Sequence, residues 1–121
     1  MDYVAVVAAL ALIEYMFIGM RTGQARVKYN VKAPATTGDP NFERHYRVQQ
    51  NTLEQLIVFL PALFLFANYV SPGWAALLGL VFIVGRAMYA SAYVADPEKR
   101  GPGFVTGYVA TAILVLGGLI G

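Results

Sequence analysis

The chain has 121 residues, of which 58% are hydrophobic and only 13% are charged, and its mean hydropathy is +0.55. So few charges cannot cover so much apolar side chain on a small water-soluble domain, so that class is excluded and an integral membrane protein is predicted. Cysteine is absent from the sequence, which excludes disulfides, zinc thiolate sites and cysteine nucleophiles. The net charge of +2 is not gathered into a basic patch, so we expect no nucleic-acid partner.

Four apolar segments follow one another along the chain, at about residues 3–20, 41–70, 73–95 and 103–121. Each is close to or longer than the ~20 residues that a helix needs to cross the hydrocarbon core of a bilayer. We therefore predict an all-α integral membrane protein, a four-transmembrane-helix bundle formed by a single domain over residues 1–121.

Cationic residues lie toward one side of this predicted bundle. Six of the nine lie in or beside the first connection, from about residue 21 to 41, and the other three lie at or toward the third: Arg21, Arg26, Lys28, Lys32, Arg44 and Arg47, then Arg86, Lys99 and Arg100. Because cytoplasmic loops carry an excess of Lys and Arg, both connections are predicted to be cytoplasmic and both termini to lie on the opposite face. Asp39 and Pro40 are typical of an N-cap and a first helical position, so they predict the start of the second helix.

The second segment begins polar, ends apolar and carries what we call the first polar row: Arg47, Asn51 and Glu54. At about 100° per residue these side chains fall within about 60° of one another, over roughly 10 Å of helix axis. A cation, an amide and a carboxylate aligned in this way form either a ligand-binding site or a buried ion-pair network that fixes helix packing.

The third segment carries a second polar row, Arg86, Tyr89 and Tyr93, with the same i, i+3, i+7 spacing. Only the short turn Ser71-Pro72-Gly73 joins the two segments, so they are expected to be antiparallel neighbours whose rows can face one another. Two alternatives stay open. The tyrosines are also typical of an interfacial aromatic belt, and Arg86 can equally pair with Glu54 in an internal salt bridge.

Together the two rows suit an elongated zwitterion better than a single inorganic ion. Arg47, Arg86 and Arg100 can bind anionic groups, and Glu54 can bind an ammonium group. The amide and phenol groups of both rows can supply hydrogen bonds.

Glu14 is a further ionisable residue within an apolar segment, where charge is costly and commonly marks a site. It is either a proton-coupled group or a neutralised carboxyl hydrogen-bonded to a neighbouring helix, and we favour the second interpretation. The sequence has no metal-ligand spacing, no phosphate-binding glycine loop and no Ser/His/Asp arrangement, so no metal is expected.

The polar start of the second helix resembles the signature of the MAPEG family, the membrane-associated proteins of eicosanoid and glutathione metabolism. The matching residues are Phe42-Glu43-Arg44, Tyr46-Arg47, Gln49, Asn51 and Glu54, together with Thr36-Thr37-Gly38 and Gly85-Arg86 with Tyr89 and Tyr93. The resemblance covers nearly the whole chain and is greatest to leukotriene C4 synthase and the related microsomal glutathione transferases.

The resemblance implies a homotrimer of four-helix subunits that binds glutathione at the subunit interfaces, near the cytoplasmic membrane surface. It assigns the γ-glutamyl end of glutathione to Arg47, Asn51, Glu54 and Tyr89, the glycyl carboxylate to Arg26 and Gln49, and the lining of the same pocket to Arg86 and Tyr93. Arg100 matches the arginine that activates the thiol, and Arg86 is the second choice for that role.

Two positions depart from leukotriene C4 synthase: Val27 stands in place of a second consecutive arginine and Gln55 in place of a tyrosine. The compact chain suggests a bacterial inner-membrane member. The resemblance thus implies a glutathione-dependent transferase or peroxidase that detoxifies lipophilic electrophiles among membrane lipids. The alternatives are a non-catalytic lipid- or glutathione-binding member and, more distantly, a small multidrug-type proton-coupled transporter that uses Glu14.

Overall fold

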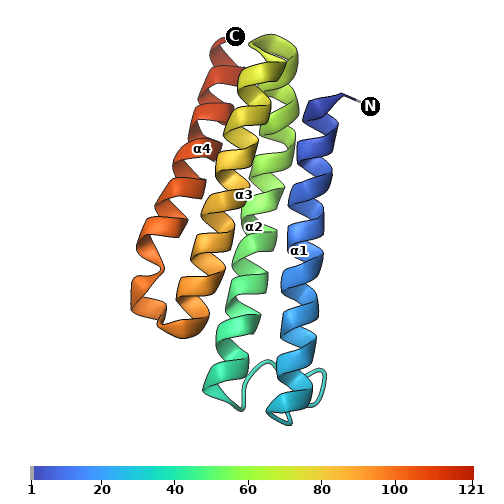
Figure 1. Ribbon diagram of the computed structural model, residues 1–121, viewed down its shortest axis with the longest axis vertical. Helices are drawn as coiled ribbons and strands as arrows, with labels where there is room; N and C mark the ends of the chain where they lie inside the picture. The colour runs from blue at the N-terminus through green and yellow to red at the C-terminus, as the bar shows by residue number, and fades with distance from the viewer. Residues whose placement is uncertain (1) are drawn as a thin grey trace.

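The computed structural model describes residues 2–121, and its regular structure within that range is entirely helical (Figure 1). The elements are α1 (Tyr3–Lys28), α2 (Pro40–Tyr69), α3 (Pro72–Ala95), the 3-10 helix η1 (Pro97–Lys99) and α4 (Gly101–Ile120). Four helices in this range are long and apolar enough to cross a membrane. The predicted all-α, four-helix membrane fold is confirmed.

Local sequence explains where α2 and α3 begin. The side chain of Asp39 accepts hydrogen bonds from the backbone N–H groups of Asn41 (2.8 Å) and Phe42 (3.1 Å), and Pro40 occupies the first helical position. Ser71 caps α3 in the same way. These side chains satisfy donors that the first helical turn leaves without partners, so the start predicted from Asp39 and Pro40 is confirmed.

The end of α1 differs from the prediction, because the helix continues past residue 20 to Lys28. No proline interrupts these two extra turns, and the helix ends only before Asn30, which adopts a left-handed φ of 57°. Arg21 and Arg26 therefore lie on the last turns of α1 and not in the loop. Cations in the last turn also interact favourably with the helix dipole.

Helices α2 and α3 form the middle of the bundle. Helix α1 packs against both of them on one side, and α4 packs against both on the other (Figure 1). Both termini lie at one end of the bundle, and the first and third connections lie at the opposite end (Figure 1). The two helices that carry the polar rows are thus the two with neighbours on both sides.

The apolar core occupies the half of the bundle nearer the termini, where the rings of Phe59 and Phe82 stack with their centroids 3.9 Å apart. Toward the other end, glycines bring α3 and α4 into close backbone contact. A Cβ on Gly85 would lie 2.7 Å from the backbone nitrogen of Gly107, and one on Gly103 would collide with the backbone of Tyr89. This contact fixes the part of α3 that carries the second polar row.

Candidate functional site

Arg86 lies at the centre of the candidate site and is 1% exposed. Its Nη2 donates hydrogen bonds of 2.8 Å to Asn51 Oδ1 and of 2.8 Å to Thr52 Oγ1, both on α2. Its guanidinium carbon also lies 4.2 Å from the centroid of the Tyr89 ring, a cation–π contact. The two polar rows therefore do face one another, and Arg86 joins them.

The partners of Arg86 decide one alternative that the sequence left open. Its hydrogen bonds go to Asn51 and Thr52, whereas Glu54 is exposed on the surface of α2. The internal salt bridge between Arg86 and Glu54 is therefore not formed. This side chain thus holds two neutral groups through Nη2, while within residues 2–121 its Nε is buried without a hydrogen-bond partner.

The first polar row is open on its outer side. Arg47 and Glu54 are exposed, and Asn51 between them is partly buried because it contacts Arg86. On α3, Tyr89 is buried and Tyr93 is partly buried, with their ring centroids 5.6 Å apart. Arg47 and Glu54, seven positions apart, are thus unpaired among the described residues at the two ends of the row, while Asn51 between them is held by Arg86.

Arg100 follows η1 and is exposed, beyond the end of α3 that carries Tyr93. Its Nη1 donates a 2.7 Å hydrogen bond to the carbonyl oxygen of Pro97 in its own turn. The structure places this arginine at the same end of the bundle as the first polar row, with its guanidinium held beside the third connection.

Gln49 and Arg26 lie away from the first polar row. The amide of Gln49 packs against α1, where its Nε2 lies 3.5 Å from the position that a Cβ on Gly19 would occupy. Nη1 of Arg26 donates to the carbonyl oxygens of Val31 (3.3 Å) and Ala35 (2.6 Å) and so holds the first connection. Within one chain, therefore, these two side chains do not lie beside Arg47.

Thr52 is the site residue that the sequence reasoning missed. It is 1% exposed, and its hydroxyl also donates a 2.7 Å hydrogen bond to the carbonyl oxygen of Val48. Val48, Thr52 and Leu56 share the buried stripe of α2. A lone hydroxyl in such a stripe is the signal that could have pointed to a buried polar partner.

Glu14 does not make the contact that we favoured from the sequence. Its Oε1 is buried and has no hydrogen-bond partner among residues 2–121, so the neutralised carboxyl bonded to a neighbouring helix is not observed. The described residues also hold no group of three side chains suited to a metal ion.

Four membrane-crossing helices, with two polar rows joined by a buried arginine, define a membrane protein with a polar site between α2 and α3. The MAPEG family matches residues 4–120, and the chain belongs to this family.

Three relatives are similar to the chain over most of its length. The chain is 50% identical over 116 residues to an uncharacterized protein of Synechocystis, covering 96% of this chain and 85% of that protein. It is 38% identical over 117 residues to microsomal glutathione S-transferase 2 of Homo sapiens, covering 97% and 80%. It is 34% identical over 102 residues to leukotriene C4 synthase of Bos taurus, covering 82% and 68%. Of these three relatives, the two with assigned activities are a glutathione transferase and a leukotriene synthase.

Proposed function

We propose that this protein is a glutathione-dependent membrane transferase or peroxidase that conjugates or reduces lipophilic electrophiles. The observation that carries the proposal is the pair of polar rows joined by Arg86, which presents a free cation and a free carboxylate with fixed hydrogen-bonding groups between them. The names of the human and bovine relatives support the same chemistry.

Glutathione carries an ammonium group, two carboxylates and a thiol, and the exposed ends of the first polar row complement it. Glu54 is suited to the ammonium group and Arg47 to a carboxylate. Asn51 uses its Oδ1 to accept from Arg86, which leaves its amide N–H groups to donate to the ligand. Arg86 therefore acts as a positioning residue for Asn51, and Tyr89 and Tyr93 complete the pocket.

The site is proposed to form between subunits of a homotrimer, with Gln49 and Arg26 supplied by a neighbouring subunit. Gln49 lies about 200° around α2 from Arg47, so one helix cannot present both side chains to one ligand. In this arrangement Arg26 holds the first connection and turns its remaining guanidinium donors toward the glycyl carboxylate.

The chemistry is proposed to be attack by the glutathione thiolate, with the protein supplying position and charge. A free thiol has a pKa of about 8.5, so only a small fraction is thiolate at neutral pH. A guanidinium against the sulfur favours the charged form, and each pKa unit of lowering requires about 1.4 kcal/mol of differential stabilisation. We assign this role to Arg100 and keep Arg86 as the second choice, because Arg86 is already committed to Asn51 and Thr52.

The protein is proposed to lie in a bacterial inner membrane with the site facing the cytoplasm. The Synechocystis relative supports the bacterial membrane. The cations gathered at the end of the bundle that holds the first and third connections support the orientation.

A second candidate is a binding member of the family without chemistry, which the engagement of Arg100 with Pro97 favours. Purified protein incubated with glutathione and either 1-chloro-2,4-dinitrobenzene or a lipid hydroperoxide separates the two. The transferase or peroxidase gives product at a rate that saturates with glutathione. Saturable glutathione binding without product in either assay supports the binding protein and contradicts catalysis.

A further inference from the structure

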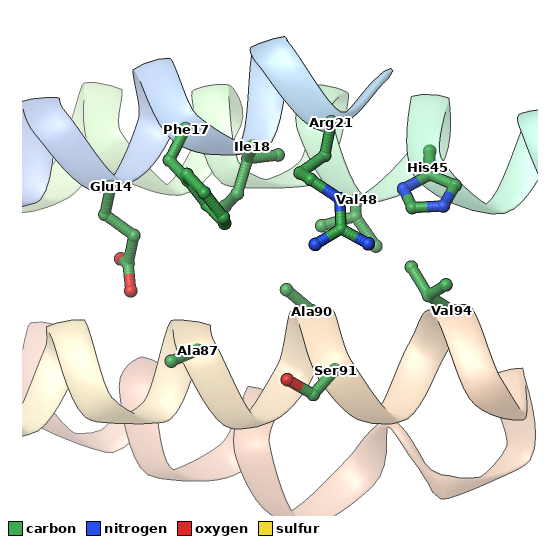
Figure 2. Close-up of a pocket in the computed structure, with 10 residues that line it drawn as sticks. All are labelled: Glu14, Phe17, Ile18, Arg21, His45, Val48, Ala87, Ala90, Ser91 and Val94. Atoms are coloured by element: carbon green, nitrogen blue, oxygen red, sulfur yellow. The ribbon is translucent and has the colours of Figure 1, made fainter. Parts of the chain in front are cut away.

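A cavity lies between α1, α2 and α3, apart from the site described above (Figure 2). Its volume is about 300 Å³, at the small end of the range of ligand pockets. One water molecule occupies about 30 Å³ of liquid, so the space holds about ten non-hydrogen atoms. Its walls are mainly apolar, including Phe17, Val48 and Ala90, while Glu14, Arg21, His45 and Ser91 add polar groups.

The cavity shares no side chain with the two polar rows. On α2 and on α3 alike, its lining residues are centred about 120° around the helix from the row that the same helix carries. A ligand in this cavity therefore leaves the proposed glutathione site free, and its binding does not depend on glutathione.

The polar groups of the cavity stand at its two ends. Figure 2 shows the Glu14 carboxylate and the Arg21 guanidinium extending from α1 toward α3, with apolar side chains between them. The two residues are seven positions apart, which puts them on one face of α1 and about 10 Å apart along its axis. His45 lies at the Arg21 end (Figure 2).

Glu14 indicates that the cavity suits a ligand that carries a hydrogen-bond donor. Its Oε1 is buried with no partner among residues 2–121, and a buried acceptor without a donor is costly. A hydroxyl group on the occupant supplies the donor that this buried oxygen lacks.

We propose that this cavity binds a medium-chain carboxylic acid that bears a hydroxyl group about 10 Å from its carboxylate, the distance between the two polar ends. The ligand carboxylate pairs with Arg21 beside His45, its chain contacts Phe17 and Val48, and its hydroxyl donates to Glu14. A fatty acid without the hydroxyl leaves Glu14 unmatched, and a diol leaves Arg21 unmatched.

Saturation-transfer NMR on the full chain in detergent micelles tests this proposal, with empty micelles as the baseline. The probes are 8-hydroxyoctanoate, octanoate and 1,8-octanediol, and the first has about as many non-hydrogen atoms as the cavity can hold. We expect 8-hydroxyoctanoate to bind at least about tenfold more tightly than either probe that lacks one polar end, because each polar contact is worth about 1.5 kcal/mol or more.

Two variants and one control locate the binding. Arg21→Gln is expected to weaken 8-hydroxyoctanoate about tenfold and leave 1,8-octanediol unchanged, because it removes the carboxylate partner. Ala90→Leu fills the cavity and is expected to abolish binding of all three probes. Lys28→Gln makes the same charge change on α1 outside the cavity and is expected to change nothing.

Three results would overturn the proposal. Equal affinities for octanoate and 8-hydroxyoctanoate would show that the cavity accepts an acyl chain and that Glu14 has no part in recognition. Binding unchanged in both Arg21→Gln and Ala90→Leu would place the probe elsewhere. A saturation-transfer signal no larger than that of empty micelles would show that the cavity does not bind this class of ligand. Arg21 is exposed, so its variant keeps the test informative if Ala90→Leu fails to fold.

Discussion

The contribution of the hydrogen bond from Arg86 to Thr52 can be measured, because the chain contains a second buried threonine, Thr111, that serves as a matched control. Thr52 and Thr111 are both buried threonines whose hydroxyls donate to the carbonyl oxygen four residues earlier, at 2.7 Å to Val48 and at 3.0 Å to Gly107. Only Thr52 also accepts a 2.8 Å hydrogen bond from the guanidinium of Arg86. Replacing each threonine by valine removes the hydroxyl and nearly preserves the shape, so the difference between the two variants isolates the bond to Arg86.

The expected size of this difference follows from the charge and burial of the donor. Hydrogen bonds to charged groups contribute about 1.5–3 kcal/mol, whereas bonds between membrane helices average about 0.6 kcal/mol with a maximum near 1.7. Arg86 keeps Asn51 as a partner when Thr52 is lost. We therefore expect Thr52→Val to lower the free energy of unfolding by about 1.5 kcal/mol more than Thr111→Val, about a tenfold difference in the unfolding equilibrium constant.

Reversible unfolding in mixed detergent and dodecyl sulfate micelles, followed by circular dichroism, measures both variants. The Arg86→Met background provides the second control, because the extra cost of Thr52→Val disappears when the donor is absent. Equal costs for Thr52→Val and Thr111→Val in the wild-type background would refute the view that Arg86 holds α2 and α3 together through Thr52.

Three further predictions concern packing, chemistry and assembly. Gly103→Ala is expected to destabilise the protein by about 1–3 kcal/mol in the same unfolding assay, because the added Cβ collides with the α3 backbone. Gly23→Ala, with open space around the added Cβ, is the control and is expected to be neutral or stabilising. Equal effects of the two substitutions would contradict the close α3–α4 contact. Arg100→Ala is expected to lose most turnover while retaining much of its glutathione affinity, with less thiolate absorbance on titration; unchanged absorbance and turnover would remove Arg100 from the mechanism. Mixed trimers of Arg47→Ala and Gln49→Ala subunits are expected to regain some glutathione binding that neither variant shows alone; verified mixed assemblies without recovery would argue against a shared site.

Much of the fold was predictable because the relevant signals are local. Four apolar stretches of membrane length specify four helices, and Asp39 with Pro40 specifies the start of α2. The periodicity of the two polar rows also predicted that they can face one another, since a turn as short as Ser71-Pro72-Gly73 makes their helices neighbours. The hydrogen bond between Arg86 and Asn51 confirms that arrangement.

Other features depend on contacts that a sequence does not display. The two extra turns of α1 lie outside the apolar stretch, so hydropathy could not predict them even though no residue before Asn30 ends the helix. The position of Thr52 in a buried stripe could indicate a polar partner but not which one, because Arg86 was equally free to pair with Glu54. The cavity around Glu14 results from how α1 meets α2 and α3, and no spacing on one helix encodes it.

Calorimetric titration of the detergent-solubilised protein with glutathione tests the central claim most directly. We expect saturable binding that Arg47→Ala and Glu54→Gln each weaken at least about tenfold, since each removes a charged partner at one end of the first polar row. Lys28→Gln, at an exposed cation on α1, is predicted to bind as the wild type does. Absence of binding, or binding that neither row variant weakens, would contradict the claim that the joined polar rows form a glutathione site.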